Sequence, residues 1–141
     1  MKVWDTSAFL SILLRQQATD ELKALLVSDG GLAVWWGAKV EAMSAVCRLR
    51  RGAEIDERAA SRLLREIEKL AVAAYEVQPT EALREIACRM LRVHELRAAD
   101  ALQLAAAFVW ADNRPSACGF VCLDRRLRAA ADKEGFDVLP L

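Results

Sequence analysis

Segments with the pattern of β-strands alternate with segments of helical periodicity from one end of this 141-residue chain to the other. The strand-like segments are short apolar runs, whereas the helical ones carry apolar residues three and four positions apart. We expect strands at 2–4, 32–36, 74–78, 120–123 and 136–139, and helices near 6–15, 21–27, 39–50, 56–70, 83–91, 98–111 and 125–133. Strict alternation of this kind predicts an α/β fold, with a parallel sheet covered by helices on both sides.

The composition is that of one ordinary globular domain. Hydrophobic residues make up 55% of the chain, and 20 Lys and Arg balance 20 Asp and Glu, which excludes a uniformly basic nucleic-acid binder but not local basic patches. No apolar run reaches the roughly 18 residues of a membrane span, and the strand-like start at residue 2 is unlike a signal peptide. We therefore expect a cytoplasmic protein. The single histidine, His94, is expected on the surface at a helix end.

Four acidic residues stand in apolar surroundings where strands end or helices begin. Asp5 and Asp124 each follow directly after an apolar strand. Glu41 lies one turn into a helix that follows a buried strand, and Asp100 lies at the start of the most apolar helix. The plainest interpretation is that they cap helices, because Asp is a common N-cap residue. Their lack of obvious basic partners nevertheless separates them from the other acids, most of which lie among Arg and Lys on solvated helix faces.

In a parallel sheet, the carboxyl ends of the strands and the amino ends of the following helices share one edge, which is where such folds bind ligands. The four acids are therefore expected to converge there. Close carboxylates repel one another unless a cation neutralises them, and hard oxygen ligands select Mg²⁺ or Mn²⁺. Such ions activate water and hold a phosphodiester for in-line attack. The pattern predicts metal-assisted phosphodiester hydrolysis, with these residues as catalytic and metal-binding groups: Asp5, Glu41, Asp100 and Asp124.

Four segments resemble the motifs of a known family. Residues 3–10 (VWDTSAFL) resemble the opening hydrophobic-Asp-Thr-Ser-Ala motif of PIN-domain nucleases, and residues 40–46 (VEAMSAV) resemble their second motif. The tail at 49–52 (LRRG) is frequent in the VapC toxins of toxin–antitoxin pairs. Residues 96–105 (LRAADALQLA) and 120–127 (FVCLDRRL) are similar to the third and fourth motifs. The resemblance keeps the family's order and covers essentially the whole chain.

The resemblance implies one PIN domain over residues 1–141, folded as a three-layer α/β/α sandwich with a central, mostly parallel sheet. It also implies a Mg²⁺- or Mn²⁺-dependent endoribonuclease. VapC-like members cut tRNA, rRNA or other RNA, are commonly homodimers, and are neutralised by a small VapB-like antitoxin. By motif, Asp5, Glu41, Asp100 and Asp124 are the metal-binding acids. Thr6 or Ser7 supports the site through a hydrogen bond to the first carboxylate or to a metal-bound water.

One position departs from the resemblance. The family often has Thr or Ser two residues before its fourth acid, whereas this chain has Cys122. A thiol is a poorer hydrogen-bond donor than a hydroxyl. The support of Asp124 is therefore expected to be weaker than in the family.

Basic and aromatic residues near the acids offer contacts for RNA. Arg48 and Arg51 follow Glu41 on the same expected helix, and Arg125 and Arg126 directly follow Asp124. Both clusters are predicted to hold RNA phosphates, with solvated helix faces as the alternative. Trp4 and Trp35 fall on buried strands and are expected in the core, whereas Trp36, at a strand end, is open to base stacking.

Three other functions were weighed. An aspartyl-phosphate phosphatase usually has a second Asp two residues after its nucleophile, but Ser7 occupies that place after Asp5. A non-catalytic binding module that kept the fold predicts that Asp5→Ala changes nothing. A PIN nuclease of RNA processing differs from a toxin in having no antitoxin gene beside its own.

Overall fold

A computed structural model describes residues 1–15 and 18–141. The described residues form five strands, seven α-helices and a short 3₁₀ helix at Pro115–Ala117. The strands are β1 (Val3–Trp4), β2 (Ala33–Trp35), β3 (Tyr75–Val77), β4 (Gly119–Val121) and β5 (Asp137–Leu139). The helices are α1 (Thr6–Leu14), α2 (Thr19–Asp29), α3 (Ala38–Arg51), α4 (Glu57–Ala73), α5 (Glu81–Val93), α6 (Ala98–Trp110) and α7 (Arg125–Lys133).

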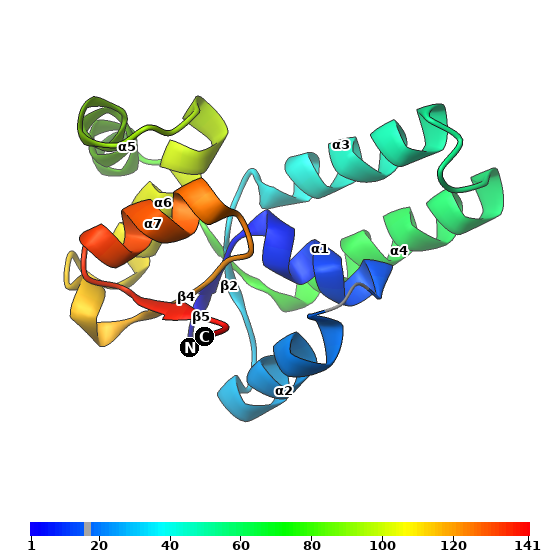
Figure 1. The fold of residues 1–141 in the computed structure, drawn as a ribbon, viewed down its shortest axis with the longest axis horizontal. Coiled ribbons are helices and arrows are strands. Elements are labelled where there is room, and N and C mark those ends of the chain that lie inside the picture. Colours follow the sequence, from blue (N-terminus) through cyan, green and yellow to red (C-terminus); the bar gives the residue numbers. More distant parts are fainter. Residues whose placement is uncertain (16–17) are drawn as a thin grey trace.

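The sheet is parallel throughout, in the order β3-β2-β1-β4-β5. The chain runs outward from β1 to β3, then returns to β4 on the other side of β1. Because crossovers between parallel strands are right-handed, this reversal places α1 to α4 on one face and α5 to α7 on the other, as Figure 1 shows. The predicted α/β/α sandwich with a central parallel sheet is confirmed.

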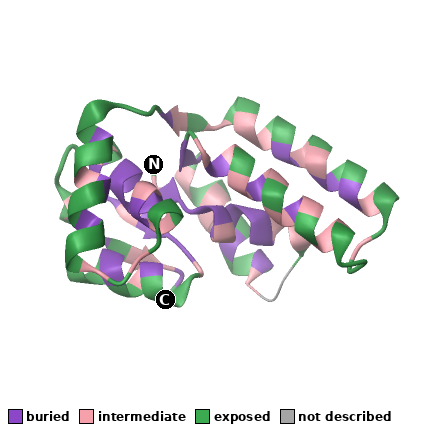
Figure 2. Ribbon diagram, turned by 90° about the horizontal axis from the view of Figure 1, so that it is seen from above, coloured by how far each residue is buried: buried purple, intermediate pink, exposed green. Residues whose placement is uncertain are grey.

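The reversal between β1 and β4 creates the switch point at which open α/β sheets bind ligands. Val3 pairs with Phe120 and Trp4 with Val121, so the two strands end side by side. Both strands are buried, as are the sheet-facing sides of the helices (Figure 2). Trp4 is fully enclosed and Trp35 nearly so, which confirms their assignment to the core, whereas Trp36 is 50% exposed.

Most expected elements are present with small shifts at their ends. Asp5 caps α1, as the capping interpretation of the four acids predicted, because its extended backbone lets its carboxylate accept the Ser7 N–H. Asp56 caps α4 at the predicted start of that helix, and Gly30 is the C-cap of α2. Gly30 has φ of +73°, a left-handed conformation that glycine adopts without strain.

His94 corrects one expectation. It does end a helix, as the C-cap of α5, but its side chain is only 7% exposed rather than lying on the surface. Its Nε2 lies 2.7 Å from Oε1 of Glu134, at the end of α7. The long-range contact holds α7 against the segment that leads into α6.

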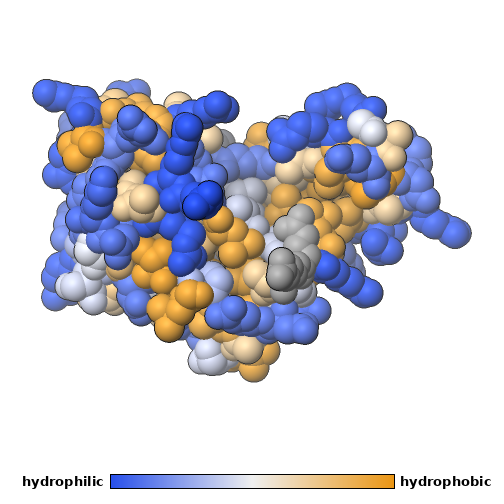
Figure 3. Space-filling model, viewed as in Figure 1, coloured by the Kyte–Doolittle hydropathy of each residue, from blue (hydrophilic) through white to orange (hydrophobic). Residues whose placement is uncertain are grey.

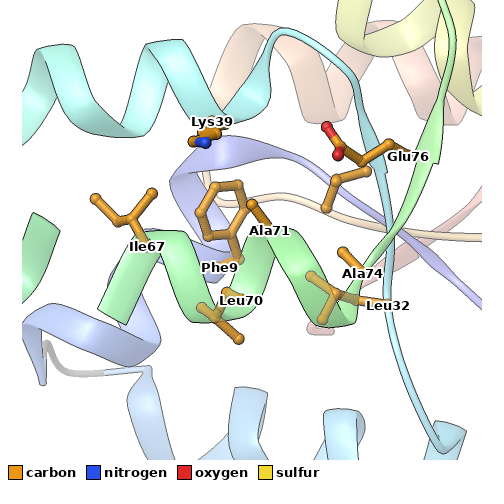
Figure 4. A pocket seen from close by; sticks show the side chains of 9 residues that line it. Phe9, Leu32, Lys39, Ile67, Leu70, Ala71, Ala74 and Glu76 are labelled. Carbon is orange, nitrogen blue, oxygen red and sulfur yellow. The ribbon is translucent and has the colours of Figure 1, made fainter. Parts of the chain in front are cut away.

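An apolar pocket lies between α1, β2 and α4, and none of the four candidate site acids lines it (Figure 4). Phe9, Ile67 and Leu70 line it, while Lys39 and Glu76 stand at its rim. Its volume of about 10 Å³ holds one water molecule at most. It is a packing gap and not a ligand site. Within the described part of the chain, no helix combines the length and apolar character that crossing a membrane requires.

Candidate metal centre

Asp5 is the most buried of the four acids. It follows β1, is 5% exposed, and is anchored to β4 by its own N–H, which donates to the carbonyl of Val121 at 2.9 Å. Its Oδ2 accepts hydrogen bonds from the Ser7 hydroxyl and from the Cys122 thiol, the latter at 3.3 Å. Burial, with a smaller contribution from the charge of Glu41, raises the pKa of Asp5 to about 6 against the opposing effect of these donors.

Glu41 lies in the first turn of α3, where Gly37 allows a close approach. A Cβ at Gly37 would lie 2.4 Å from Nε1 of Trp35, so the start of the helix packs directly against that indole. The Oε2 atom of Glu41 accepts hydrogen bonds from the Thr6 hydroxyl at 2.9 Å and from Nε2 of Gln103 at 2.8 Å. Burial raises its pKa, these donors lower it, and the charge of Asp100 raises it again.

Asp100 and Asp124 form the more open end of the cluster. Asp100 lies in the first turn of α6, and Asp124 is the N-cap of α7, where its Oδ1 accepts the Leu127 N–H at 2.9 Å. Burial raises the pKa of Asp100, and so does the charge of Asp124, whereas Arg97 and Arg126 oppose the rise. Arg126 is therefore close enough to influence the acidic cluster.

The four carboxylates follow one another across the edge of the sheet. Asp5 is affected by the charge of Glu41, Glu41 by that of Asp100, and Asp100 by that of Asp124. Four helices begin here, and their partial positive charge favours anions. The pKa values of Asp5, Glu41 and Asp100 are nevertheless raised, first by burial and then by the charge of a neighbouring acid, so ionising the whole cluster is unfavourable without a counter-ion.

The donor set suits a hard divalent cation. Carboxylate oxygens select Mg²⁺ and Mn²⁺, and a bound cation would offset both the burial and the mutual repulsion that raise these pKa values. In their present positions, however, no three His, Cys, Asp or Glu side chains among residues 1–15 and 18–141 are gathered closely enough to hold a metal ion. Binding to three of the acids therefore requires their side chains to move together.

Thr6 and Ser7, both predicted as supporting residues, have different partners. Ser7 binds Asp5, and its Oγ also accepts the N–H of Leu123 at 3.0 Å, which links the ends of β1 and β4. Thr6 binds Glu41 rather than the first carboxylate. Cys122 donates to Asp5, and it approaches only the backbone carbonyl of Asp124, at 3.7 Å. In these contacts position 122 therefore supports Asp5 and not the carboxylate of Asp124.

The four arginines predicted for RNA lie at different places. Arg125 and Arg126 are exposed in the first turn of α7, beside Asp124. Arg48 and Arg51 lie in the last turn of α3, seven and ten residues beyond Glu41, or about 10 and 15 Å along the helix. The structure thus brings the α7 pair to the acids and leaves the α3 pair at the far end of its helix.

Two neighbours of the acids were not foreseen. Gln103 contacts both Thr6 and Glu41, and Arg97 influences Asp100. The one signal for Gln103 in the sequence is that it is polar within the otherwise apolar core of α6. Figure 3 shows the molecule hollowed between the α5–α7 side and the α3–α4 pair, with hydrophilic residues on both rims. The strands end toward this hollow (Figure 1).

Comparison with known proteins identifies the fold. No model of a known protein family matches the chain, and no curated protein matches it either. Among solved structures, FitAcB from Neisseria gonorrhoeae is similar, with a TM-score of 0.66 and 19% sequence identity. The similarity covers 99% of this chain and 97% of that chain. It shows a shared PIN-like fold over the whole length.

Proposed function

We propose that this protein is a Mg²⁺- or Mn²⁺-dependent endoribonuclease of the PIN class. The observation that carries the proposal is the row of four carboxylates at the switch point, three of which have pKa values raised by burial and by one another's charge. The motif resemblance and the fold shared with FitAcB support it. The acids that would hold the metal are Asp5, Glu41, Asp100 and Asp124.

A bound divalent ion supplies a Lewis acid that activates water and stabilises charge on the scissile phosphate. The protein's own residues prepare the site for it. Ser7 and Cys122 hold Asp5, while Thr6 and Gln103 hold Glu41. Arg125 and Arg126, which lie beside Asp124, would bind RNA phosphates next to the acids, and Arg48 and Arg51 would bind phosphates farther along the RNA.

We also propose that the protein acts in the cytoplasm as the toxin of a toxin–antitoxin pair, as a homodimer that a VapB-like antitoxin neutralises. The VapC-like motifs support this assignment. Expression of the chain should arrest growth, and co-expression of a short reading frame that adjoins its gene should relieve the arrest. A protein that cleaves RNA without arresting growth, and that has no such neighbour, is instead a nuclease of RNA processing.

The activity is tested by incubating a mixed RNA pool with the protein, with and without Mg²⁺, and sequencing the new ends. We expect discrete cuts that need the metal and that disappear in Asp5→Asn. Asp20→Asn, an exposed acid on α2, is the matched control and should cut like the wild type. Failure of the folded wild type to cut any RNA in the pool contradicts the proposal and favours a binding module.

A further inference from the structure

Gln103 is an anomaly in the core. It lies on α6 among buried apolar residues and is itself only 1% exposed. Burying a primary amide costs free energy unless both its donors and its acceptor find partners. Its Oε1 has no hydrogen-bond partner within the described structure. A buried carbonyl without a partner destabilises the folded state, so stability alone does not explain why a glutamine occupies this position. The explanation must lie in the contacts that its amino group makes.

The amino group of Gln103 is fully engaged. Nε2 donates to the Thr6 hydroxyl at 2.7 Å and to Oε2 of Glu41 at 2.8 Å. The Thr6 hydroxyl in turn donates to the same Oε2 at 2.9 Å. These contacts form a closed triangle that joins α1, α3 and α6, and both donors meet the carboxylate at a single oxygen.

The charge of Glu41 sets the orientation of the amide. With the amide turned over, Oε1 of Gln103 would face the Oε2 atom of Glu41, and two acceptors would oppose one another. The observed orientation leaves Oε1 of Gln103 unpaired instead. For Glu41, the arrangement occupies Oε2 and leaves Oε1 without a hydrogen bond among the described residues.

We propose that Gln103 is a positioning residue for Glu41, which fixes its carboxylate through Oε2 so that Oε1 is available to a divalent cation. This inference rests on the proposed function, because it gives Glu41 the role of a metal ligand. Partners that orient a ligand typically change metal affinity 10–100-fold when they are removed. Gln103 and Thr6 act on Glu41 together from two different helices.

The test measures Mn²⁺ affinity of the full chain by electron paramagnetic resonance of the free ion, without RNA. Gln103→Met keeps the length of the side chain and removes its donors. We expect affinity to fall about tenfold. Because Gln103→Met removes an unsatisfied buried carbonyl together with the donors, its unfolding midpoint in EDTA should stay near that of the wild type. Ser11→Ala, which removes a buried hydroxyl without a partner elsewhere on α1, is the control and should bind normally.

A double-mutant cycle separates positioning from a general effect on structure. In the Glu41→Gln background, Gln103→Met should weaken Mn²⁺ binding by no more than about twofold, because its target is gone. An equal loss in both backgrounds overturns the proposal, and so does wild-type affinity in Gln103→Met. A wild type that binds no Mn²⁺ instead overturns the proposed function.

A second measurement needs no stable variant. The side-chain amide signals of the wild-type glutamines are followed by NMR while Mg²⁺ is added. The Gln103 signal should move with metal, whereas the signal of Gln78, which is exposed and donates to the carbonyl of Glu76, should not. A Gln103 signal that stays in place while Mg²⁺ binds contradicts the proposal.

Discussion

The Sγ atom of Cys122 lies 3.3 Å from Oδ2 of Asp5, although 117 residues separate them along the chain. The register of β1 and β4 causes this contact. Trp4 pairs with Val121, so the next residue of each strand faces the other at the carboxyl edge of the sheet. The first acid of the cluster is therefore held by a thiol from β4 and by the Ser7 hydroxyl from α1.

Substitution at position 122 should shift the pKa of Asp5. A hydroxyl is a stronger donor than a thiol, and donors to the charged form lower a carboxyl pKa. Cys122→Ser should therefore lower the pKa of Asp5 below its wild-type value of about 6, and Cys122→Ala should raise it. Carboxyl ¹³C NMR titration in EDTA measures both. Cys118→Ser, at a buried cysteine without contact to Asp5, is the control; the opposite order of Ser and Ala would contradict the assigned contact.

Metal-free stability should fall as the pH rises through the titration of Asp5. Its folded pKa of about 6 lies above its ordinary value of 3.8, so the folded state holds a proton that the unfolded state has released. Between these two pH values the free energy of unfolding should decline, by about 3 kcal/mol at most. Asp5→Asn should lack this decline.

Urea unfolding in EDTA at pH 4 and pH 6.5 measures the free energy of unfolding of the wild type and of Asp5→Asn. Taking the difference between the two proteins at each pH cancels the contribution of the other carboxyls. Adding Mg²⁺ at pH 6.5 should stabilise the wild type and have little effect on Asp5→Asn. If the free energy of unfolding changes with pH in the same way for the wild type and for Asp5→Asn, the pKa of Asp5 is not raised in the folded state.

Asp29 should have the opposite pH dependence, because its pKa is lowered. Burial acts to raise it, but hydrogen bonds from the Lys2 backbone and side chain outweigh burial, with the charges of Lys2 and the N-terminus. The ionised Asp29 carboxylate therefore stabilises the folded state at pH values above the pKa of Asp29 in the unfolded chain. The stabilisation disappears as the pH falls through the pKa of Asp29 in the folded protein. Asp29→Asn should cost about 1–2 kcal/mol at pH 7 and much less at pH 2.5. Urea unfolding at both pH values measures it, and an equal cost at both would rule out the ionic contribution.

Arg126 should contribute to the salt dependence of RNA binding. In the Asp5→Asn protein, which is expected not to cut, Arg126→Gln should weaken binding and reduce the slope of log K against log salt by about 0.7. Arg92→Gln, at an exposed position near the end of α5, is the control. Fluorescence anisotropy with a labelled single strand gives both slopes. An unchanged slope for Arg126→Gln would place this arginine outside the RNA contact.

The fold could be predicted because its signals are local. Strand and helix periodicities, and caps such as Asp56 and Gly30, are properties of a few neighbouring residues. The position of the four acids followed from the same pattern, since strand ends and helix starts share an edge. Asp5 both follows β1 and caps α1, so the capping role and the strand-end position that the sequence indicated belong to one residue.

The partners within the site could not be predicted, because they depend on tertiary contacts. Gln103 reaches residues 62 and 97 positions away, and in the sequence it is only one polar residue within an apolar helix. His94 is similar, since its partner Glu134 lies 40 residues away and nothing near His94 indicates burial. Which acid each hydroxyl holds likewise depends on how α1 packs against α3.

The central claim is that the four carboxylates form one metal-dependent nuclease centre. The most direct measurement is the initial rate of cleavage of one purified RNA, identified by its cut ends, as a function of Mg²⁺ concentration. We expect a saturable rate that EDTA abolishes and that falls at least about 100-fold in Asp5→Asn and Asp100→Asn, while Asp20→Asn keeps the wild-type curve. A rate that persists in EDTA, or that survives both substitutions, would contradict the account.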